Sequence, residues 1–201
     1  MGTAIGLALQ EGYIIRATDL SPKAVERAEK EAKSFGVTIT FGVADFRTLE
    51  KQIPGLYDVI ISCDNSLPHL LTDEDILVAL RNMSAKLHPD GLLLLSIRDY
   101  DHLLQERPQT MPVSVFDKPE GRHISFQVWD WQNGQKYMIH HFILKQVNRQ
   151  WDTAERITEY RALKREELTK FLLKTGFSDI TWQMPEQTGY YQPVVTARKK
   201  D

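Results

Sequence analysis

The chain has little cysteine, no long apolar run and no excess of one charge. Cys63 is the single cysteine among 201 residues, so a disulfide within the chain is excluded and the composition fits a reducing cytoplasm. No run of about 18 apolar residues occurs, and we expect no membrane span. The first residues have neither the basic region nor the cleavage site of a secretory signal, so we expect none. With 25 basic and 27 acidic residues, the chain has no excess of basic residues of the kind that binds nucleic acid or an anionic membrane.

Features of several common site types are also missing. No cluster of cysteine and histidine has metal-ligand spacing, and the neighbours His140 and His141 would point to opposite faces of a strand, so we predict no metal. The pattern G-x-G-x-x-G is absent. No linker, repeat or low-complexity segment divides the 201 residues, of which 42% are apolar. We therefore predict a single domain over residues 1–201.

Short apolar segments alternate with helical patterns in the first half of the chain. An apolar stripe at helical spacing runs from Ala24 to Phe35, and either Ser21 or Asp19 is placed to cap that helix. A second helix follows Thr72 or Asp73. Strands alternating with helices predict an α/β fold with a Rossmann-like, mostly parallel sheet. The strands expected in it are residues 13–18, 38–43, 57–62 and 92–97.

The pattern changes after Leu104. Residues 122–131, 136–147 and 151–163 are long segments of strand composition, and Asn133-Gly134 between the first two predicts a type I′ hairpin turn. We interpret residues 105–163 as an antiparallel insert over the ligand crevice. Aromatic and histidine side chains of this insert either line the crevice or pack across strands, namely Trp129, Trp131, Tyr137 and His141. A helix over residues 165–175 and a closing pair of strands, 180–183 and 194–197, complete the prediction.

Polar residues stand where three predicted strands end. Asp19 follows the first strand, Asp45 the second, and Cys63-Asp64-Asn65-Ser66 the third. Parallel sheets bind ligands beyond the carboxyl ends of their strands. Two carboxylates at successive ends suit a nucleoside: Asp19 for the ribose hydroxyls and Asp45 for the adenine amino group, with Phe46 covering the ring. Each aspartate has an alternative role as a helix cap.

These strand ends, together with two further segments, resemble the class I S-adenosylmethionine-dependent methyltransferases. Residues 61–66 followed by His69-Leu70 are similar to the fourth-strand segment of the branch that includes glycine N-methyltransferase, and residues 98–104 are similar to its fifth-strand segment. The resemblance covers nearly the whole chain. It implies S-adenosylmethionine as the cofactor and methyl transfer to a small-molecule acceptor, which we predict to be an amine.

The resemblance also implies roles for individual residues. Asn65 touches the acceptor, Arg98 matches the position that binds an acceptor carboxylate, and Tyr100 lies beside the reacting groups. The alternative for Arg98 is an ion pair with Asp99, Asp101 or a carboxylate of the insert. The cofactor-binding residues implied are Gly2, Thr3, Asp19, Leu20, Ala44, Asp45, Phe46 and Cys63, the last through its backbone carbonyl.

One departure from the family bears on activity. The family opens with a central strand and a Gly-rich loop, and this sequence begins at what resembles the tail of that loop. We expect the strands at residues 13–18 and 57–62 to face a gap, which sheet closure or a partner would fill. A protein that binds S-adenosylmethionine or a partner without catalysis therefore stays open as an alternative. A nicotinamide-dependent oxidoreductase explains Asp19 but not Asp45. The oligomeric state is left open, a homo-oligomer included.

Overall fold

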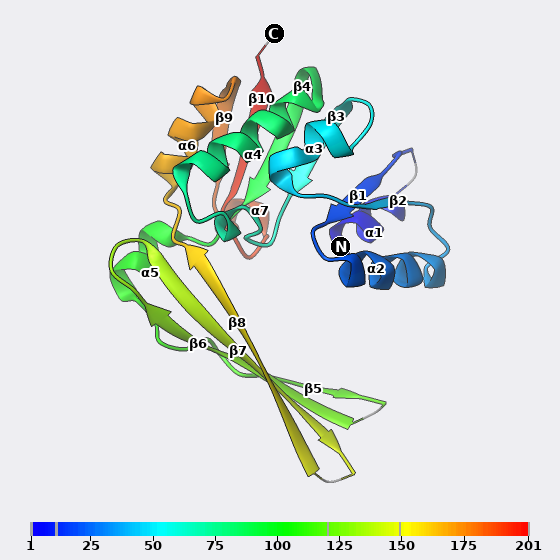
Figure 1. Cartoon of the computed structure of the whole chain (residues 1–201), viewed down its shortest axis with the longest axis vertical. Helices are drawn as coiled ribbons and strands as arrows, with labels where there is room; N and C mark the ends of the chain where they lie inside the picture. The colour runs from blue at the N-terminus through cyan, green and yellow to red at the C-terminus, as the bar shows by residue number, and fades with distance from the viewer. Residues whose placement is uncertain (1, 11, 120, 149, 201) are drawn as a thin grey trace.

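The computed structural model describes residues 2–10, 12–119, 121–148 and 150–200, which form three sheets with helices around two of them (Figure 1). The predicted α/β fold class is confirmed, because parallel strand pairs joined through helices carry the first half of the chain and antiparallel strands follow. In the described part of the chain, no helix has the length and apolar character needed to cross a membrane.

The N-terminal unit is a two-stranded parallel sheet with two helices. It comprises α1 (Gly2–Ala8), β1 (Arg16–Asp19), α2 (Pro22–Ser34) and β2 (Thr40–Val43). Ser21 is the N-cap of α2, since its hydroxyl accepts a hydrogen bond from the Ala24 amide at 3.3 Å. The predicted first strand starts too early: Tyr13 and Ile14 are exposed, and pairing begins only where the Thr40 amide donates to the Ile15 carbonyl.

The main sheet has the order β3-β4-β10-β9. Its strands are β3 (Tyr57–Ser62), β4 (Leu87–Ser96), β10 (Val194–Lys199) and β9 (Phe177–Gln183). β3 and β4 are parallel, and the predicted closing pair β9 and β10 is antiparallel, as expected. The turn expected at residues 89–91 lies within β4, where the register with β3 shifts.

The core lies between this sheet and its helices. α4 (Asp73–Ala85) begins at the predicted cap Thr72, and α6 (Arg165–Lys174) ends before Gly176. α4 packs against β4 and α6 against β9, and the two helices contact each other. Ile76, Leu80, Leu95, Leu168 and Val195 are among the fully buried side chains of the shared core. Shorter elements connect the strands: η1 (Phe46–Thr48), α3 (Leu49–Gln52), η2 (Leu67–His69), α5 (Tyr100–Glu106) and α7 (Pro185–Thr188).

The gap expected between the first and third strands is present. β1 pairs with β2 and β3 with β4, and neither has a second partner strand among the described residues. The sheet closure considered as one way to fill this gap therefore does not occur. Val59 and Ile61 on β3 remain exposed, as apolar side chains of a strand with a free edge would be.

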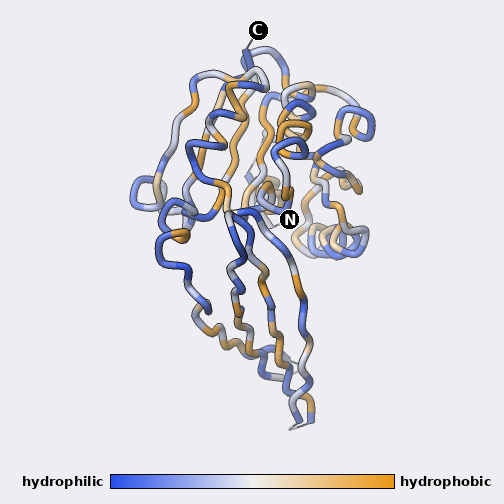
Figure 2. Tube along the Cα trace, turned by 60° about the vertical axis from the view of Figure 1, so that its left-hand side comes forward, coloured by the Kyte–Doolittle hydropathy of each residue, from blue (hydrophilic) through white to orange (hydrophobic). Residues whose placement is uncertain are grey.

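A long antiparallel sheet extends away from the helices (Figures 1 and 2). It consists of β5 (Ser114–Lys118), β6 (Gly121–Trp131), β7 (Lys136–Val147) and β8 (Gln150–Arg161) in sequential order, and we call it the long sheet. β6, β7 and β8 confirm the predicted strands, whereas β5 was not predicted. The hairpin prediction was partly wrong: Gly134 has a φ of 78° but Asn133 does not have a positive φ, and a type I′ turn needs both.

Candidate functional site

Asp19 and Asp45 stand at neighbouring strand ends. Asp19 is paired with Val43 in the parallel register, and the Ala44 amide donates a hydrogen bond of 3.1 Å to the Asp19 carbonyl. The Asp19 carboxylate accepts one hydrogen bond of 2.8 Å from the Ser21 amide. The β1–β2 unit thus brings the two predicted nucleoside-binding acids to the same edge, as the sequence suggested.

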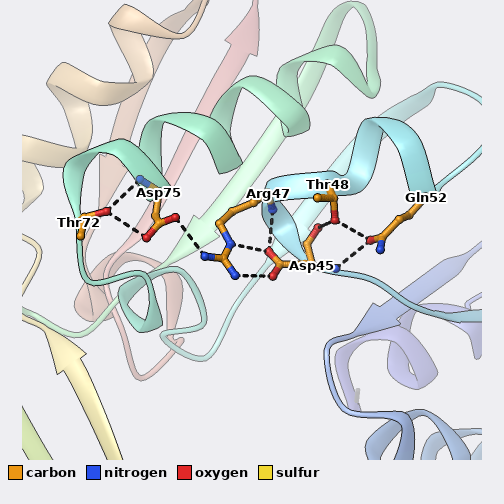
Figure 3. A network of polar contacts seen from close by, with 6 residues as sticks. All are labelled: Asp45, Arg47, Thr48, Gln52, Thr72 and Asp75. Atoms are coloured by element: carbon orange, nitrogen blue, oxygen red, sulfur yellow. Dashed lines mark hydrogen bonds and ion pairs between the residues drawn. The ribbon is translucent and has the colours of Figure 1, made fainter.

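Asp45 also has the structural role that was its alternative (Figure 3). Its carboxylate caps η1 through the Arg47 amide at 2.8 Å and pairs with the Arg47 guanidinium at 3.1 and 2.7 Å. These hydrogen bonds lower the pKa of Asp45, although burial opposes the shift. The Arg47 guanidinium also forms an ion pair of 3.1 Å with the carboxylate of Asp75 on α4. The network therefore links the end of β2 to the start of that helix.

The Asp45 carboxylate still has an acceptor position left. A carboxylate offers about four lone-pair sites, and three hydrogen bonds reach it, two at Oδ1 and one at Oδ2. The Asp45 carboxylate can therefore keep its hydrogen bonds to Arg47 and accept one more from a ligand. Because the charged form is favoured, Asp45 remains an acceptor at neutral pH.

The remaining residues predicted to bind the cofactor lie on several elements. Gly2 and Thr3 belong to the first turn of α1, Leu20 is exposed between β1 and α2, and Phe46 begins η1. The Cys63 carbonyl accepts a hydrogen bond of 2.7 Å from the Ser66 hydroxyl, which leaves it one lone pair. The structure does not bring all of them to one described cavity, and their cofactor roles stay predictions.

The three residues predicted to act on the acceptor meet in one hydrogen-bonded group. Asn65 follows β3 in the left-handed region with a φ of 62°, which Asn tolerates better than most residues. Its side-chain oxygen accepts hydrogen bonds from the Arg98 amide at 3.1 Å and the Tyr100 hydroxyl at 3.0 Å. Its Nδ2 is buried with no partner among the described residues. A buried donor without a protein acceptor can be satisfied by a water molecule or by a ligand atom.

Arg98 lies in an aromatic enclosure supplied by the long sheet. Its guanidinium carbon is 4.7 Å from the Trp129 ring centroid and 5.3 Å from that of Tyr160, distances typical of cation–π contacts. Its Nη1 donates to the Tyr137 hydroxyl at 2.8 Å, and that hydroxyl lies 2.8 Å from the hydroxyl of Tyr100. Trp129 and Tyr137 were predicted either to line the crevice or to pack across strands; their rings stack on each other across β6 and β7 and enclose Arg98.

Arg98 has no carboxylate at ion-pair distance in the described part of the chain. The acids proposed as its alternative partners are engaged elsewhere: Asp99 and Asp101 pair with Arg165 at 3.7 and 2.9 Å. Asp99 also caps α5. The ion-pair alternative for Arg98 is therefore contradicted for Asp99, Asp101 and every described carboxylate of the insert. Arg98 is partly buried, and a cation withdrawn from water without an anion carries a desolvation cost that a negatively charged ligand would offset.

The groups around Arg98 are neutral at physiological pH. Burial raises the pKa of Tyr100, Tyr137 and Tyr160, so their hydroxyls stay protonated. Burial would by itself lower the pKa of Arg98, but the surrounding tyrosine hydroxyls raise it overall. Burial and the charge of Arg98 lower the pKa of His69, whose ring packs at a tilt against that of Tyr160. Arg98 is thus the permanent charge of this enclosure.

A cavity of about 360 Å³ opens beside Arg98. Its walls come from the end of β3, the long sheet and the segment before β10, and they include Asp64, Ser125, Gln127, Tyr191 and Gln192. Neither Asp19 nor Asp45 lines it. The volume is at the lower end of the range for small-molecule sites.

Asp64 and two tyrosines form a rim that sequence reasoning did not find. Asp64 has a φ of 61°, and its carboxylate accepts hydrogen bonds from the hydroxyls of Tyr190 and Tyr191, the latter at 2.8 Å. These residues are about 126 positions apart, so no local pattern could have joined them. The rim holds the segment before β10 against the end of β3.

Comparisons with known proteins agree with this geometry. A family model described as a methyltransferase domain matches residues 2–91. A glycine/sarcosine N-methyltransferase of Parasynechococcus marenigrum is 35% identical over 97 residues, covering 48% of this chain and 34% of the relative. Another of Halorhodospira halochloris is 26% identical over 145 residues, covering 68% and 54%.

A solved structure supports the fold over nearly the full chain. The S-adenosylmethionine-bound amino pentose methyltransferase from Micromonospora echinaspora matches with a TM-score of 0.72 and 16% identity, covering 99% of this chain and 81% of that one. The chain spans about a third to a half of the length of the two curated relatives above. The chain is thus similar to S-adenosylmethionine-dependent methyltransferases in fold, and over part of its length it is similar in sequence to relatives named as glycine/sarcosine N-methyltransferases.

Proposed function

We propose that this protein transfers the methyl group of S-adenosylmethionine to the nitrogen of a small amine that also carries a carboxylate. The observation that carries the proposal is the partly buried Arg98, enclosed by Trp129, Tyr137 and Tyr160 and without an acidic partner in the described structure. Relatives of the chain are named for glycine and sarcosine, which combine an amine with a carboxylate.

Arg98 has the donors that a carboxylate needs. A guanidinium has five N–H donors in a planar fork that matches a carboxylate with two parallel hydrogen bonds. Tyr137 uses one of them at Nη1, and the cation–π contacts with Trp129 and Tyr160 occupy ring faces rather than donors. An acceptor carboxylate would therefore receive both hydrogen bonds and the missing negative charge.

The β1–β2 edge fits the nucleoside of the cofactor. Asp19 would take the ribose hydroxyls with the acceptor positions that Ser21 leaves, Asp45 would take the adenine amino group, and Leu20 and Phe46 would cover the ring. The Cys63 carbonyl would take the amino group of the methionine part. When bound, S-adenosylmethionine supplies a methyl group on a positively charged sulfur.

The chemistry of the enclosure favours nitrogen as the acceptor atom. An alcohol needs a base to remove its proton, whereas a neutral amine attacks a methyl sulfonium directly. The hydroxyls of Tyr100 and Tyr137 hold their protons at neutral pH because burial raises their pKa. The protein therefore contributes mainly position: Arg98 anchors the acceptor and Asn65 Nδ2 offers it a hydrogen bond.

Arg98→Ala tests the proposal, with Arg122→Ala as the control. Arg122 forms an ion pair with Asp117 on the long sheet and does not line the cavity. Calorimetry with S-adenosylhomocysteine should give unchanged affinity for both variants. The KM for amino acids should rise at least about tenfold for Arg98→Ala alone, the loss of affinity expected for a hydrogen bond to a charged group.

A comparison of two substrates that differ only in the carboxylate tests the role of Arg98 more directly. An amino acid should be methylated by the wild type and its decarboxylated analogue only poorly, while Arg98→Ala should no longer distinguish the two. Equal loss of S-adenosylhomocysteine and acceptor binding in Arg98→Ala would refute the role of Arg98. Binding of S-adenosylhomocysteine without turnover of any amine would indicate the non-catalytic alternative.

A further inference from the structure

A serine and a histidine of the long sheet form a hydrogen-bonded pair in the wall of the cavity beside Arg98. Ser125 on β6 lines the cavity, and its Oγ lies 2.6 Å from Nε2 of His141 on β7. The register explains this contact, because His141 is opposite Gln127, which shares a face of β6 with Ser125. His141 is not among the described residues that line the cavity. A ligand there would therefore reach the histidine through the serine hydroxyl.

The proposed reaction must remove a proton from the amine. An alkyl amine is protonated at neutral pH, as is the lysine side chain, whose pKa is about 10.4. The nitrogen has to lose this proton before its lone pair can attack a methyl group. Tyr100 and Tyr137 do not accept it, because burial raises their pKa and they keep their own protons. The Asp64 carboxylate already accepts hydrogen bonds from two tyrosine hydroxyls.

An imidazole is the side chain best suited to accept a proton near neutral pH, because it ordinarily titrates at about 6.5. The neighbouring His140 lies 3.0 Å from Asp130 and 2.7 Å from Glu155. His141, in contrast, has no carboxylate at ion-pair distance among the described residues. Its Nε2 faces the Ser125 hydroxyl instead, and a hydroxyl can donate one proton while it accepts another.

The other charged and titratable groups around the pair come from four elements. Arg156 on β8 is opposite His141, and its positive charge opposes protonation of the ring rather than favouring it. The remaining groups are His123 on the same face of β6 and, in the walls of the cavity, Asp64, Arg98 and Tyr191. The pair thus lies in the same cavity walls as Arg98, which anchors the acceptor in the proposed function.

We propose that Ser125 and His141 form a proton relay for the acceptor amine. The inference rests on the proposed methyl transfer. The ammonium group of the acceptor gives a proton to Ser125 Oγ while the Ser125 hydroxyl proton moves to Nε2 of His141. The nitrogen lone pair then forms a bond to the methyl carbon, and the electron pair of the broken carbon–sulfur bond stays on sulfur. His141 afterwards returns its proton to the solvent.

The pH dependence of kcat in Ser125→Ala and His141→Gln tests the relay. Both variants should lose at least about a hundredfold in kcat at about pH 7, the usual contribution of a general base. The loss should shrink as the pH approaches the pKa of the amine, because the acceptor then loses its proton to the solvent. KM should change little, since Arg98 is intact. The double variant should be no slower than either single variant, because the two residues act as one unit.

His140→Gln is the matched control. His140 is the neighbour of His141 on β7 and points to the opposite face, where it pairs with Asp130 and Glu155. The same chemical change there should leave kcat unaltered at every pH. A loss in Ser125→Ala and His141→Gln that is the same at every pH would assign the pair a structural role and overturn the relay. An unchanged kcat in either variant would overturn it as well.

Heteronuclear NMR of the histidine rings tests the relay without turnover. In neutral His141 the proton should be on Nδ1, because Nε2 accepts the hydrogen bond from Ser125. A proton on Nε2 of the neutral ring would block the transfer and overturn the relay, whatever the activity. A wild type that methylates no amine refutes the proposed function and the relay together. An active wild type with a wrong tautomer or a pH-independent loss refutes the relay alone.

Discussion

Tyr137→Phe should destabilise the protein through the loss of one oxygen. Tyr137 is fully buried, and its hydroxyl accepts a hydrogen bond of 2.8 Å from Arg98 and lies 2.8 Å from the hydroxyl of Tyr100. The phenylalanine ring would keep the stacking contacts with Trp129 and Trp131, so packing changes little. Arg98 would lose its one side-chain acceptor, while Tyr100 keeps Asn65 as a partner.

The expected magnitude follows from the charged partner. Hydrogen bonds to charged groups contribute about 1.5–3 kcal/mol, and a neutral bond adds up to roughly 1 kcal/mol. We expect the free energy of unfolding to fall by about 2–3 kcal/mol, which for a chain of this size lowers Tm by roughly 4–12 °C. Urea denaturation followed by circular dichroism measures the first quantity, and calorimetry measures the second.

Tyr160→Phe is the control for this substitution. The Tyr160 ring stacks on Tyr137 with centroids 5.6 Å apart, but its hydroxyl makes no side-chain hydrogen bond to another described residue. The same chemical change should therefore alter the free energy of unfolding by less than about 0.5 kcal/mol. If the two variants lose equal stability, or if Tyr137→Phe is neutral, the hydrogen-bonded account of Arg98 is refuted.

Two further predictions concern the scaffold of the site. Arg47→Ala should lower stability by less than about 1 kcal/mol at neutral pH, because its ion pair with Asp45 is partly exposed. Arg47 lowers the pKa of Asp45. The stabilisation is therefore present above the ordinary pKa of aspartate and is lost as the pH falls through the lower pKa of the folded state. The denaturation curves of Arg47→Ala and the wild type should converge in acid, and a stability difference that stays constant with pH would contradict the assignment. Gly91→Ala should destabilise by about 1–3 kcal/mol, because the added Cβ would lie 2.8 Å from the His88 carbonyl oxygen. Gly42→Ala, whose Cβ would meet only an ordinary contact at 3.9 Å, should change stability less in the same urea titration.

The sequence predicted the local structure of the chain well. Helix caps such as Ser21 and Thr72, and strands such as Tyr57–Ser62, follow from residue types a few positions apart. The errors are also local: Tyr13 and Ile14 are apolar but exposed, because β1 has a partner strand on one side only. Periodicity cannot show whether an apolar residue has a neighbour to pack against.

The surroundings of Arg98 could be predicted only in part. The resemblance identified Asn65, Arg98 and Tyr100, which lie at two neighbouring strand ends. The enclosure adds Trp129 and Tyr160 from a sheet that follows 30 to 60 residues later along the chain. Which insert side chains face the arginine depends on how the long sheet packs against the body, and that contact leaves no pattern in the sequence.

The rim formed by Asp64, Tyr190 and Tyr191 indicates at which stage of folding the cavity forms. It joins positions about 126 residues apart, and the other walls come from the long sheet between them. Contacts of such separation form only after intervening loops have closed at an entropic cost. The cavity is therefore a late product of folding, and a ligand bound there would report the assembly of the whole chain rather than of any one segment.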